Sequence, residues 1–388
     1  MQSMSSGRNT CRIMRAGWTQ KKLGDICEVL DSKRKPITKS ARVAGMIPYY
    51  GATGIQDYVK DFIFDGRFLL VGEDGAKWGQ DDNSAYIIEG KSWVNNHVHI
   101  LRVHDDALDS FVRYFLNRKD LTPFITGAVV PKLTQAALVS IPIPIPPLSE
   151  QKTIVAEIDL LSDLLEKQKT QLKEYDTLAR SIFYDMFGDP EENKRGWDVK
   201  EMGDLYDIGS SKRVFESEWK DSGVPFYRAR EIVRLSKNEA IESPIFISED
   251  LYIQYSQKFG VPSAGDIMVT AVGTLGVSYI VQTKDRFYFK DGNILWFRSR
   301  GLCESRFIKD QYATAFVVNQ IQGNANAAVV GTYTIMNAKK TRVVVPPLSL
   351  QREYVERVRA IDNQKETINK AIKETQTLFN FTMDKYFG

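Results

Sequence analysis

The chain has 388 residues and a mass of 44.2 kDa, which exceeds the size at which a single hydrophobic core usually stops growing. Hydrophobic residues make up 43% of it and charged residues 26%, ordinary globular values that exclude a largely disordered or collagen-like protein. With a net charge of +3, the chain is only mildly basic, so any affinity for nucleic acid has to come from local clusters of charge. We therefore expect two or more folded domains.

The cysteines and the first residues bear on the cellular compartment. Cys11, Cys27 and Cys303 are far apart and odd in number, which argues against a disulfide framework or a zinc site built from paired cysteines. Residues 1–17 contain no apolar stretch suited to a signal peptide, and no run of about 18 uncharged apolar residues suits a membrane span. These features predict a cytoplasmic protein that does not associate with a membrane.

The chain contains an internal repeat. The segment GWTQKKLGDI at 17–26 returns as GWDVKEMGDL at 196–205, and VSIPIPIPPLSEQ at 139–151 returns as RVVVPPLSLQ at 342–351. The repeat closes with MFG at 186–188 and YFG at 386–388. Equivalent positions lie 179 residues apart at the first landmark and 200 apart at the last, so insertions are expected inside the second copy.

The interior of each copy is rich in short apolar runs punctuated by Gly, Asp and Asn, which predict β-strands. In the first copy these runs are 50–59, 67–72, 85–90 and 98–103, and their counterparts are 266–273, 277–282 and 293–298. One longer helix-compatible run interrupts the strands of each copy, at 109–119 and at 305–318. Each copy is therefore expected to form an α+β domain, whose strand order stays open.

A long helix follows each domain. Apolar positions alternate at spacings of three and four residues, which predicts a heptad seam on a helix of about 37 residues and on the order of 55 Å. The first seam is Ile154, Ile158, Leu161, Leu165, Gln168, Leu172, Tyr175, Ala179, Ile182 and Met186. The second, more polar seam is Tyr354, Val358, Ile361, Lys365, Ile368, Ile372, Thr375, Phe379, Thr382 and Tyr386. We expect the two helices to pack on each other as a coiled coil.

The start and the middle of these helices carry polar signals. Each helix follows a Pro-Pro and a Leu-Ser step, so Ser149 and Ser349 are predicted as N-caps. Gln168 and Lys365 interrupt the seams near mid-helix. They either fix register and antiparallel orientation or mark a solvated gap where the helices diverge, and the sequence leaves both interpretations open.

The paired motifs G-W-x-x-x-x-[LM]-G-D-[IL] and P-P-L-S-x-Q, each in the same order twice and each followed by a heptad helix, resemble the DNA-specificity subunits of type I restriction-modification systems. The resemblance covers residues 17–388. It implies an α+β fold class, with two homologous strand-rich target-recognition domains in tandem, separated by two long antiparallel coiled-coil helices. The implied segments are an N-terminal tail (1–16), recognition domain 1 (17–147), helix 1 (148–188), recognition domain 2 (189–346) and helix 2 (347–388).

The same resemblance implies a function. Each recognition domain would read one half of a bipartite, asymmetric site in double-stranded DNA, while the helices set the spacer and dock two methyltransferase (modification) subunits. Restriction/translocase subunits would complete the complex, and S-adenosylmethionine, ATP and Mg are expected on the partner subunits, with no cofactor or metal in this chain. The chain lacks the N-P-P-[YF], D-P-P-[YF] and G-x-G-x-x-G motifs, so we expect a recognition subunit and not an enzyme.

Three alternatives remain at this stage. The chain could be the specificity subunit of a related bifunctional restriction system, an enzyme with its own methyltransferase or nuclease activity, or a coiled-coil interaction protein that binds no nucleic acid. Two segments bear on the enzyme alternative. Residues 85–92 (AYIIEGKS) match a relaxed phosphate-loop pattern, but their interior is strand-like and is not a glycine-rich turn.

The second such segment is Glu73-Asp74 with Lys77, which resembles a nuclease site but lacks further acidic metal ligands. Residues 271–276 of the second copy differ there in chemistry, which favours a DNA-facing loop over a plain surface turn. His97, His99 and His104 lack the spacing of a helical metal pair and are expected to be structural. Trp18 and Trp197, at matched places, are expected to anchor the two cores, although a partner contact is the alternative.

Candidate DNA-contacting residues follow from what base edges and phosphates need, namely Arg, Lys, Asn and small hydroxyl groups. In the first domain they are Lys33, Arg34, Lys35, Tyr50, Lys77, Trp78, Asn95, Asn96 and Lys132. In the second they are Lys212, Arg213, Arg228, Arg230, Thr274, Asn293, Asn324 and Asn326. The basic runs 33–35 and 212–213 fall at equivalent places and suit phosphate contacts better than base contacts.

Overall fold

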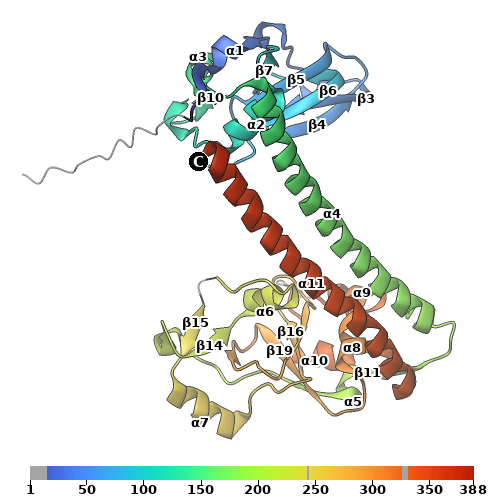
Figure 1. The fold of residues 1–388 in the computed structure, drawn as a ribbon. Coiled ribbons are helices and arrows are strands. Elements are labelled where there is room, and N and C mark those ends of the chain that lie inside the picture. Colours follow the sequence, from blue (N-terminus) through green and yellow to red (C-terminus); the bar gives the residue numbers. More distant parts are fainter. Residues whose placement is uncertain (1–14, 243, 326–330) are drawn as a thin grey trace, which may run out of the picture. The chain divides into compact units, whose positions relative to one another are not determined.

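The computed structural model describes residues 15–242, 244–325 and 331–388, and these divide into two compact units (Figure 1). Unit 1 comprises Met1–Lys169 with Lys370–Gly388, and unit 2 comprises Thr170–Asn369. The two long helices, α4 (Leu148–Phe187) and α11 (Leu348–Phe387), contribute one part to each unit. Of the predicted N-terminal tail, only Arg15 and Ala16 lie within the described residues.

Unit 1 contains a six-stranded sheet of order β2-β7-β5-β6-β3-β4, in which all neighbours are antiparallel except the parallel pair β3 and β6. The strands of unit 1, inside and outside this sheet, are β1 (Thr19–Lys22), β2 (Cys27–Val29), β3 (Ala44–Gly51), β4 (Gly54–Val59), β5 (Phe64–Gly72), β6 (Ala85–Val94), β7 (Val98–Val103), β8 (Ile125–Thr126), β9 (Lys132–Leu133) and β10 (Pro142–Ile145). Its short helices are α1 (Leu23–Ile26), α2 (Asp109–Arg118) and α3 (Gln135–Ser140), with 3-10 turns η1 (Asp31–Lys33), η2 (Lys39–Ala41) and η3 (Thr122–Phe124).

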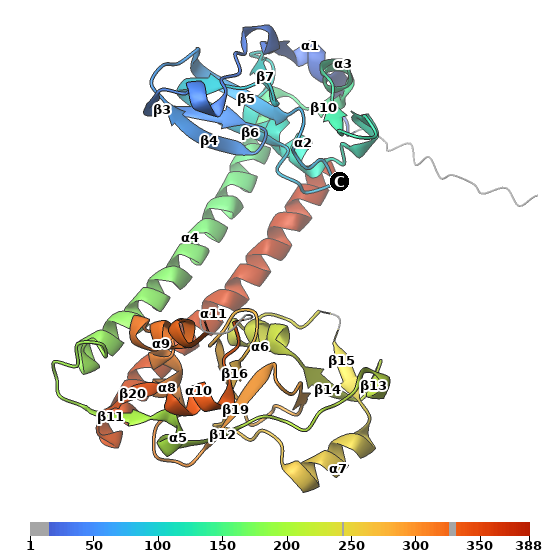
Figure 2. The ribbon, with the colours of Figure 1, turned by 180° about the vertical axis from the view of Figure 1, so that it is seen from behind.

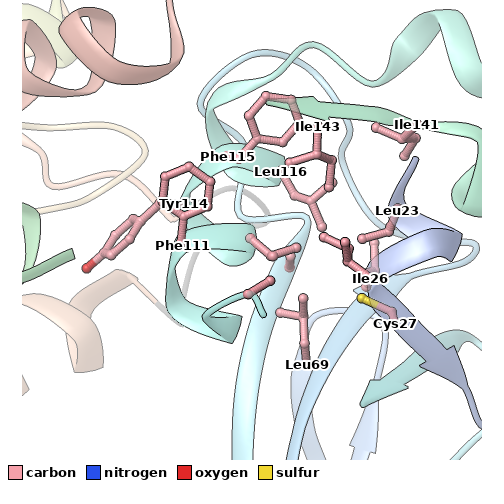
Figure 3. Close-up of a cluster of buried hydrophobic side chains, with 14 of the residues drawn as sticks. Leu23, Ile26, Cys27, Leu69, Phe111, Tyr114, Phe115, Leu116, Ile141 and Ile143 are labelled. Atoms are coloured by element: carbon pink, nitrogen blue, oxygen red, sulfur yellow. The ribbon is translucent and has the colours of Figure 1, made fainter. Parts of the chain in front are cut away.

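The centre of the unit 1 sheet, at β5, is buried on both faces. Because side chains alternate along a strand, Leu69 and Val71 of β5 enter the core on one face and Phe68 and Leu70 enter a second core on the other. Figure 3 shows the first core, which contains Phe111, Phe115 and Leu116 of α2 together with Leu23 and Ile26 of α1. The predicted strands at 50–59, 67–72, 85–90 and 98–103 and the helix at 109–119 are therefore confirmed in type.

Unit 2 repeats this plan with the sheet divided in two. Its strands are β11 (Asp198–Glu201), β12 (Tyr206–Gly209), β13 (Trp219–Lys220), β14 (Val224–Tyr227), β15 (Ile245–Ile247), β16 (Ile267–Thr270), β17 (Ser278–Ile280), β18 (Tyr288–Phe289), β19 (Ile294–Ser299) and β20 (Arg342–Val345). The two sheets have the orders β12-β19-β16-β17 and β13-β15-β14-β18. The place of the long strand β6 is taken by two short strands, β17 and β18, one in each sheet.

The helices of unit 2 are α5 (Met202–Leu205), α6 (Ala229–Ser236), α7 (Glu249–Phe259), α8 (Ser305–Gln311), α9 (Ala315–Ala325) and α10 (Ile335–Lys340), with the 3-10 turn η4 (Glu216–Glu218). The insertion expected in the second copy contains α6, β15 and α7, which lie between β14 and β16. Figure 2 shows α7 beside β14, where Leu251 and Tyr255 pack against a core that includes Phe226. The expectation of one interior helix per copy was therefore wrong for the second copy.

The predicted helix at 305–318 is also divided, into α8 and α9. The side chain of Gln311 forms two hydrogen bonds with the main chain of Val344, and the hydroxyl of Thr314 donates to the carbonyl of Gln311. The carbonyl of Thr314 then accepts the N–H of Val318, so Thr314 begins a new helix. Helical periodicity alone does not reveal this break because both halves bury apolar residues against the same core.

The repeated opening motif is explained by a close approach of two helices. A Cβ atom at Gly24 of α1 would lie 2.9 Å from the Cβ of Val139 in α3, and one at Gly203 of α5 would lie 3.2 Å from the Cβ of Lys339 in α10. Trp18 is buried in the core of unit 1, as expected, with its indole N–H donated to Glu150. Trp197 is only half-buried and is not part of the core, contrary to the expectation, and its indole N–H is donated to the carbonyl of Phe187.

Within each unit the long helices pair antiparallel. In unit 1, Tyr386 donates to Glu157 at 2.6 Å and Gln168 donates to Thr375 at 3.3 Å, so rising numbers on α4 meet falling numbers on α11. In unit 2, Lys365 pairs with Asp176, and the rings of Phe183 and Tyr354 lie 5.7 Å apart. Every predicted seam position is buried or half-buried, so the coiled-coil prediction is confirmed.

The two polar seam residues therefore have partners on the facing helix, which favours the interpretation that they fix register. The predicted N-caps were wrong: each helix begins at Leu148 or Leu348, and the carbonyls of Pro147 and Pro347 accept the first helical N–H groups. No helix among the described residues is both long and apolar enough to cross a membrane.

We expect Gly24→Ala to destabilise unit 1 by about 1–3 kcal/mol, because the new methyl group must displace Val139 between α1 and α3. Thermal or urea unfolding of the full chain measures the effect. The matched control is Gly323→Ala in α9, where a Cβ atom meets nothing within 4 Å and helix propensity favours alanine. Equal stability of Gly24→Ala and wild type would contradict the close-packing explanation.

Candidate nucleic-acid interface

In unit 1, several loops meet at one end of the sheet. The N–H of Glu73, just after β5, donates to the carbonyl of His97 at 2.9 Å, and the N–H of Leu133 donates to the carbonyl of Glu73 at 2.8 Å. The N–H of Asn95 donates to the carbonyl of Tyr50 at 3.1 Å. These bonds join the end of β3, the segment after β5, the segment between β6 and β7, and strand β9.

Unit 2 has the same main-chain connections. The N–H of Ala271, after β16, donates to the carbonyl of Asn293 at 2.9 Å, and the N–H of Tyr333 donates to the carbonyl of Ala271 at 2.9 Å. The N–H of Lys290 donates to the carbonyl of Tyr227 at 2.8 Å. We call this region the loop end of each domain. It comprises residues 31–35, 50–53, 73–84, 95–97 and 127–132 in unit 1 and 210–214, 227–230, 271–276 and 290–293 in unit 2.

The loop end of unit 1 contains four ionisable side chains that gather around His99 of β7; with it they are Asp31, Arg34, Glu73, His99 and Lys132, which we call the ionic cluster. Asp31, Glu73 and His99 are buried, Arg34 is half-buried, and the side chain of Lys132 is 42% exposed. His99 Nδ1 lies 2.5 Å from Asp31 Oδ2, and Lys132 Nζ lies 2.7 Å from Glu73 Oε1. Arg34 pairs with Glu73 and also donates to the carbonyls of Asn96 and Val98. The cluster therefore joins η1, the end of β5, the segment before β7 and β9 through side chains as well.

Both carboxylates of the ionic cluster are held in the charged form. Burial acts to raise the pKa of Asp31, but hydrogen bonds from His99 and from the N–H of Ile100 outweigh it and lower that pKa. Burial likewise acts to raise the pKa of Glu73, and hydrogen bonds from Lys132 and Arg34 lower it. The pKa of Lys132 is raised in turn by its hydrogen bond to Glu73.

The places of His99, Glu73 and Asp31 carry neutral residues in unit 2. Strand pairing matches Val71↔His99 in unit 1 with Val269↔Leu295 in unit 2, and the main-chain bonds above match Glu73 with Ala271. The position of Asp31 corresponds to Ser210, whose hydroxyl donates to the carbonyl of Ile294. Arg34 has an arginine, Arg213, as its counterpart. Arg34 pairs with Asp31 and Glu73, whereas Arg213 pairs with Asp291 at 2.9 Å and its side chain is 65% exposed.

The ionic cluster contains three groups with metal-ligating atoms within 4.8 Å of one another, Asp31, Glu73 and His99. Their chemistry does not fit a metal ion. The two nitrogens of His99 face an Asp31 oxygen and the Leu133 carbonyl, so neither directs a lone pair at a common point with the carboxylates. Glu73 is already neutralised by Arg34 and Lys132.

The structure brings the predicted DNA-contacting residues of the first domain to the loop end, with different exposure. Lys33, Lys35, Lys77 and Asn96 are exposed, and Arg34, Tyr50 and Lys132 are half-buried. Trp78 is 9% exposed and donates its indole N–H to the carbonyl of Gly72, so its side chain belongs to the core. Asn95 is 3% exposed and accepts the N–H of His97, so it shapes the segment before β7.

In the second domain, Lys212, Arg213, Arg230 and Thr274 are exposed and Asn293 is half-buried at the loop end. The guanidinium groups of Arg228 and Arg230 both bind Glu231, a buried carboxylate in the first turn of α6. Burial acts to raise the pKa of Glu231, but these arginines lower it. Asn324 belongs to the end of α9, and Asn326 lies outside the described residues.

Two residues of the loop ends were missed by the sequence analysis. His97 is 51% exposed beside Asn96, and its Nδ1 lies 2.5 Å from Asp74 Oδ1. Lys290 precedes Asp291 and is fixed by its main-chain bond to Tyr227. Their proximity in sequence to Asn96 and Asn293 is the signal that could have identified them. The relaxed phosphate-loop pattern lies inside the continuous strand β6, which agrees with its rejection.

We expect Glu73→Gln to lower the stability of unit 1 by roughly 1–3 kcal/mol at neutral pH, because Arg34 and Lys132 lose a buried charged partner. Since the pKa of Glu73 is lowered from its ordinary value of 4.5, its contribution is present above that pH and lost as the pH falls below it. The difference in Tm between wild type and variant should therefore shrink below about pH 4.5. Glu89→Gln, at an exposed partner of Arg67, is the control and should change little at any pH.

Comparison with known proteins gives a consistent family. A model described as the type I restriction modification DNA specificity domain matches residues 15–174 and again 194–376. A putative type I restriction enzyme specificity subunit of Haemophilus influenzae is 32% identical over 91% of this chain and 89% of its own length. The type I restriction enzyme MjaVIII specificity subunit of Methanocaldococcus jannaschii is 22% identical over 93% of this chain and 91% of its own length.

Solved structures share the fold. The type I restriction-modification S subunit from M. genitalium superposes with a TM-score of 0.65 at 14% identity, covering 99% of this chain and 98% of that one. A chain from a study of complex assembly and conformational transition of the type I R-M system has a TM-score of 0.53 at 16% identity, covering 97% and 98%. The chain therefore belongs to the type I restriction-modification DNA specificity family and is a specificity subunit with two copies of that domain.

Proposed function

We propose that each domain binds one half of a bipartite, asymmetric site in double-stranded DNA through its loop end. The observation that carries this proposal is the repetition of one main-chain framework with different side chains. Glu73 and Ala271 occupy the same place in that framework, as do His99 and Leu295. Two copies of one reader with different surfaces suit two different half-sites.

The exposed residues of the loop ends form two groups of proposed DNA contacts. Lys33 and Lys35 in the first domain and Lys212 in the second are exposed on the segment after the first strand of the sheet, where long flexible cations suit phosphates. Asn96 and Thr274 are exposed on the other loops, where amide and hydroxyl groups suit base edges. Trp78 and Asn95 are left out of this assignment because the core holds them.

The long helices are proposed to set the spacer between half-sites and to dock the partner subunits. Each helix has 40 residues, about 60 Å at 1.5 Å per residue. Exposed apolar side chains on them, Leu160, Leu164, Leu178, Leu378 and Phe381, provide contact area for other proteins. We propose two methyltransferase subunits and restriction/translocase subunits as these partners, with S-adenosylmethionine, ATP and Mg bound by them, in the cytoplasm.

In this proposal the chain itself carries out no chemistry. Its relatives are specificity subunits, and the acidic residue that most resembled a nuclease group, Glu73, is buried between Arg34 and Lys132. A carboxylate paired with two cations in this way is poorly suited to bind a catalytic metal ion.

The test is selection of duplexes from a randomised library by the chain alone and by its complex with a methyltransferase subunit. We expect enrichment of a split sequence with a fixed gap. Asn96→Ala should relax the preference at base pairs of one half-site by about 1–3 kcal/mol, whereas Lys33→Ala/Lys35→Ala should weaken binding to all sequences and lower the salt dependence. Salt-sensitive binding without an enriched sequence would contradict the proposal.

A further inference from the structure

A short hairpin at the loop end of unit 1 carries two exposed valines. Strands β8 and β9 pair antiparallel, and residues 127–131 form the tip between them. Every residue of this tip is exposed, with Val129 at 93% and Val130 at 62%. Its sequence, GAVVP, contains no charged side chain and none that forms hydrogen bonds. The side chains of the tip therefore offer apolar contact surface alone.

The tip stands on a fixed support. Gly127 has a φ of +93°, and a Cβ atom there would lie 2.4 Å from the carbonyl oxygen of Val130, so only glycine fits the start of the tip. At the other end, the side chain of Leu133 is fully buried in the first core, and its N–H donates to the carbonyl of Glu73. Lys132 binds the carboxylate of Glu73 as well. These contacts hold the two valines at the loop end.

The apolar letters of the tip recur in the second copy of the repeat. Leu133 and Tyr333 occupy equivalent places in the main-chain framework of the two domains. Counted back from them, Ala-Val-Val at 128–130 returns as Ala-Val-Val at 328–330. The second set lies outside the described residues, so this part of the repeat is known from the sequence alone.

This recurrence contrasts with the rest of the loop ends, where Glu73 is replaced by Ala271 and His99 by Leu295. Residues that differ suit two different half-sites, whereas residues that recur suit a feature common to both. Valine cannot form hydrogen bonds with base edges, but it can contact thymine methyl groups, deoxyribose carbons and the faces of bases. Thymine methyl groups depend on the sequence, while sugars and base faces are present at every base pair. The recurrence therefore favours the sugars and base faces.

The neighbours of the tip favour DNA over a protein as its occupant. Lys132 follows the tip directly, and Lys33, Lys35 and Lys77 are exposed on other segments of the same loop end. Cations around an apolar tip suit duplex DNA, which has charged phosphates outside its grooves and apolar carbon surface within them. The long helices, by contrast, carry exposed leucines of their own for protein contacts.

We propose that residues 127–131 of the first domain are an apolar wedge that enters a groove of duplex DNA, where Val129 and Val130 pack against deoxyribose carbons and base faces whatever the sequence. This inference rests on the proposed DNA binding by the loop end. It adds a third group of contacts to the phosphate and base-edge contacts above. The wedge contributes affinity and not sequence preference.

The test compares wild type with Val129→Ser/Val130→Ser, using the full chain in its complex with a methyltransferase subunit. We expect the affinity for the selected duplex and for an unrelated duplex to fall by the same factor, about tenfold, because the apolar burial of two valines is lost. The slope of log affinity against log salt should stay unchanged, since no phosphate contact is removed. The heat-capacity change of binding, from calorimetry at several temperatures, should become less negative.

The matched control is Val43→Ser. Val43 is 62% exposed, as Val130 is, but it precedes β3 at the end of that strand opposite to the loop end. It should leave affinity, salt slope and heat-capacity change at their wild-type values. Thermal unfolding of all variants checks that the chain stays folded, which is expected for substitutions at exposed positions.

Two further variants separate the shape of the tip from its chemistry. Gly127→Ala keeps both valines but displaces the Val130 main chain, and it should reproduce the affinity loss on both duplexes. Val129→Ile/Val130→Ile keeps the apolar surface and should bind as wild type does. Serine variants that bind both duplexes as tightly as wild type would overturn the proposal.

Other outcomes would assign the tip to a different role and so overturn the wedge. An affinity loss confined to the selected duplex, and reproduced in wild type by thymine-to-uracil replacement, would show base reading through a methyl group. Unchanged DNA affinity with weaker assembly of the methyltransferase complex would show a protein-docking surface. Absence of any sequence preference in wild type would overturn the proposed function instead, and the unrelated duplex would then still decide on the wedge.

Discussion

Each domain is joined to its long helix by one buried glutamine, the last residue of the P-P-L-S-x-Q motif. Gln151 accepts the N–H of Leu108 at 2.8 Å and donates to the carbonyls of Pro146 and Asp106. Gln351 makes the same kind of contacts with the N–H of Glu304 and the carbonyl of Pro346. Both side chains are fully buried, so an apolar residue there would leave main-chain groups without partners, at a cost of about 1–3 kcal/mol each.

This contact fixes more than a helix start. The N–H groups that the glutamines bind, Leu108 and Glu304, immediately precede α2 and α8, the helices that cover one face of each sheet. The position of α2 determines how Phe111 and Phe115 meet β5, and β5 leads directly into the loop end at Glu73. The same side chain thus couples the long helix, the core and the orientation of the proposed reading surface within each unit.

Sequence patterns were sufficient to predict the features that repeat along the chain or that have a regular spacing of apolar residues. The paired motifs located both domains, the heptads identified seams that are buried, and alternating apolar runs placed strands such as β5 and β7. Features that depend on contacts between residues far apart in the sequence could not be predicted from it. Gln311, where α8 ends, binds Val344. Trp78 is buried in the same core as Phe111 of α2, and Asn95 is bonded to Tyr50 and Gln56.

Charge was the least predictable property of the candidate site. Arg34 and Arg213 occupy equivalent places and have similar neighbours in sequence, yet Arg34 is mostly buried against Glu73 whereas the side chain of Arg213 is 65% exposed. The difference arises from Glu73 and Ala271, which lie about 40 and 60 residues further along the chain. The loop segments of both domains are held by main-chain hydrogen bonds, which any residue except proline can donate, so side chains there can change without loss of the framework. A fold that fixes its loops in this way can present different chemistry from the same positions, which is the requirement for two homologous domains that recognise different half-sites.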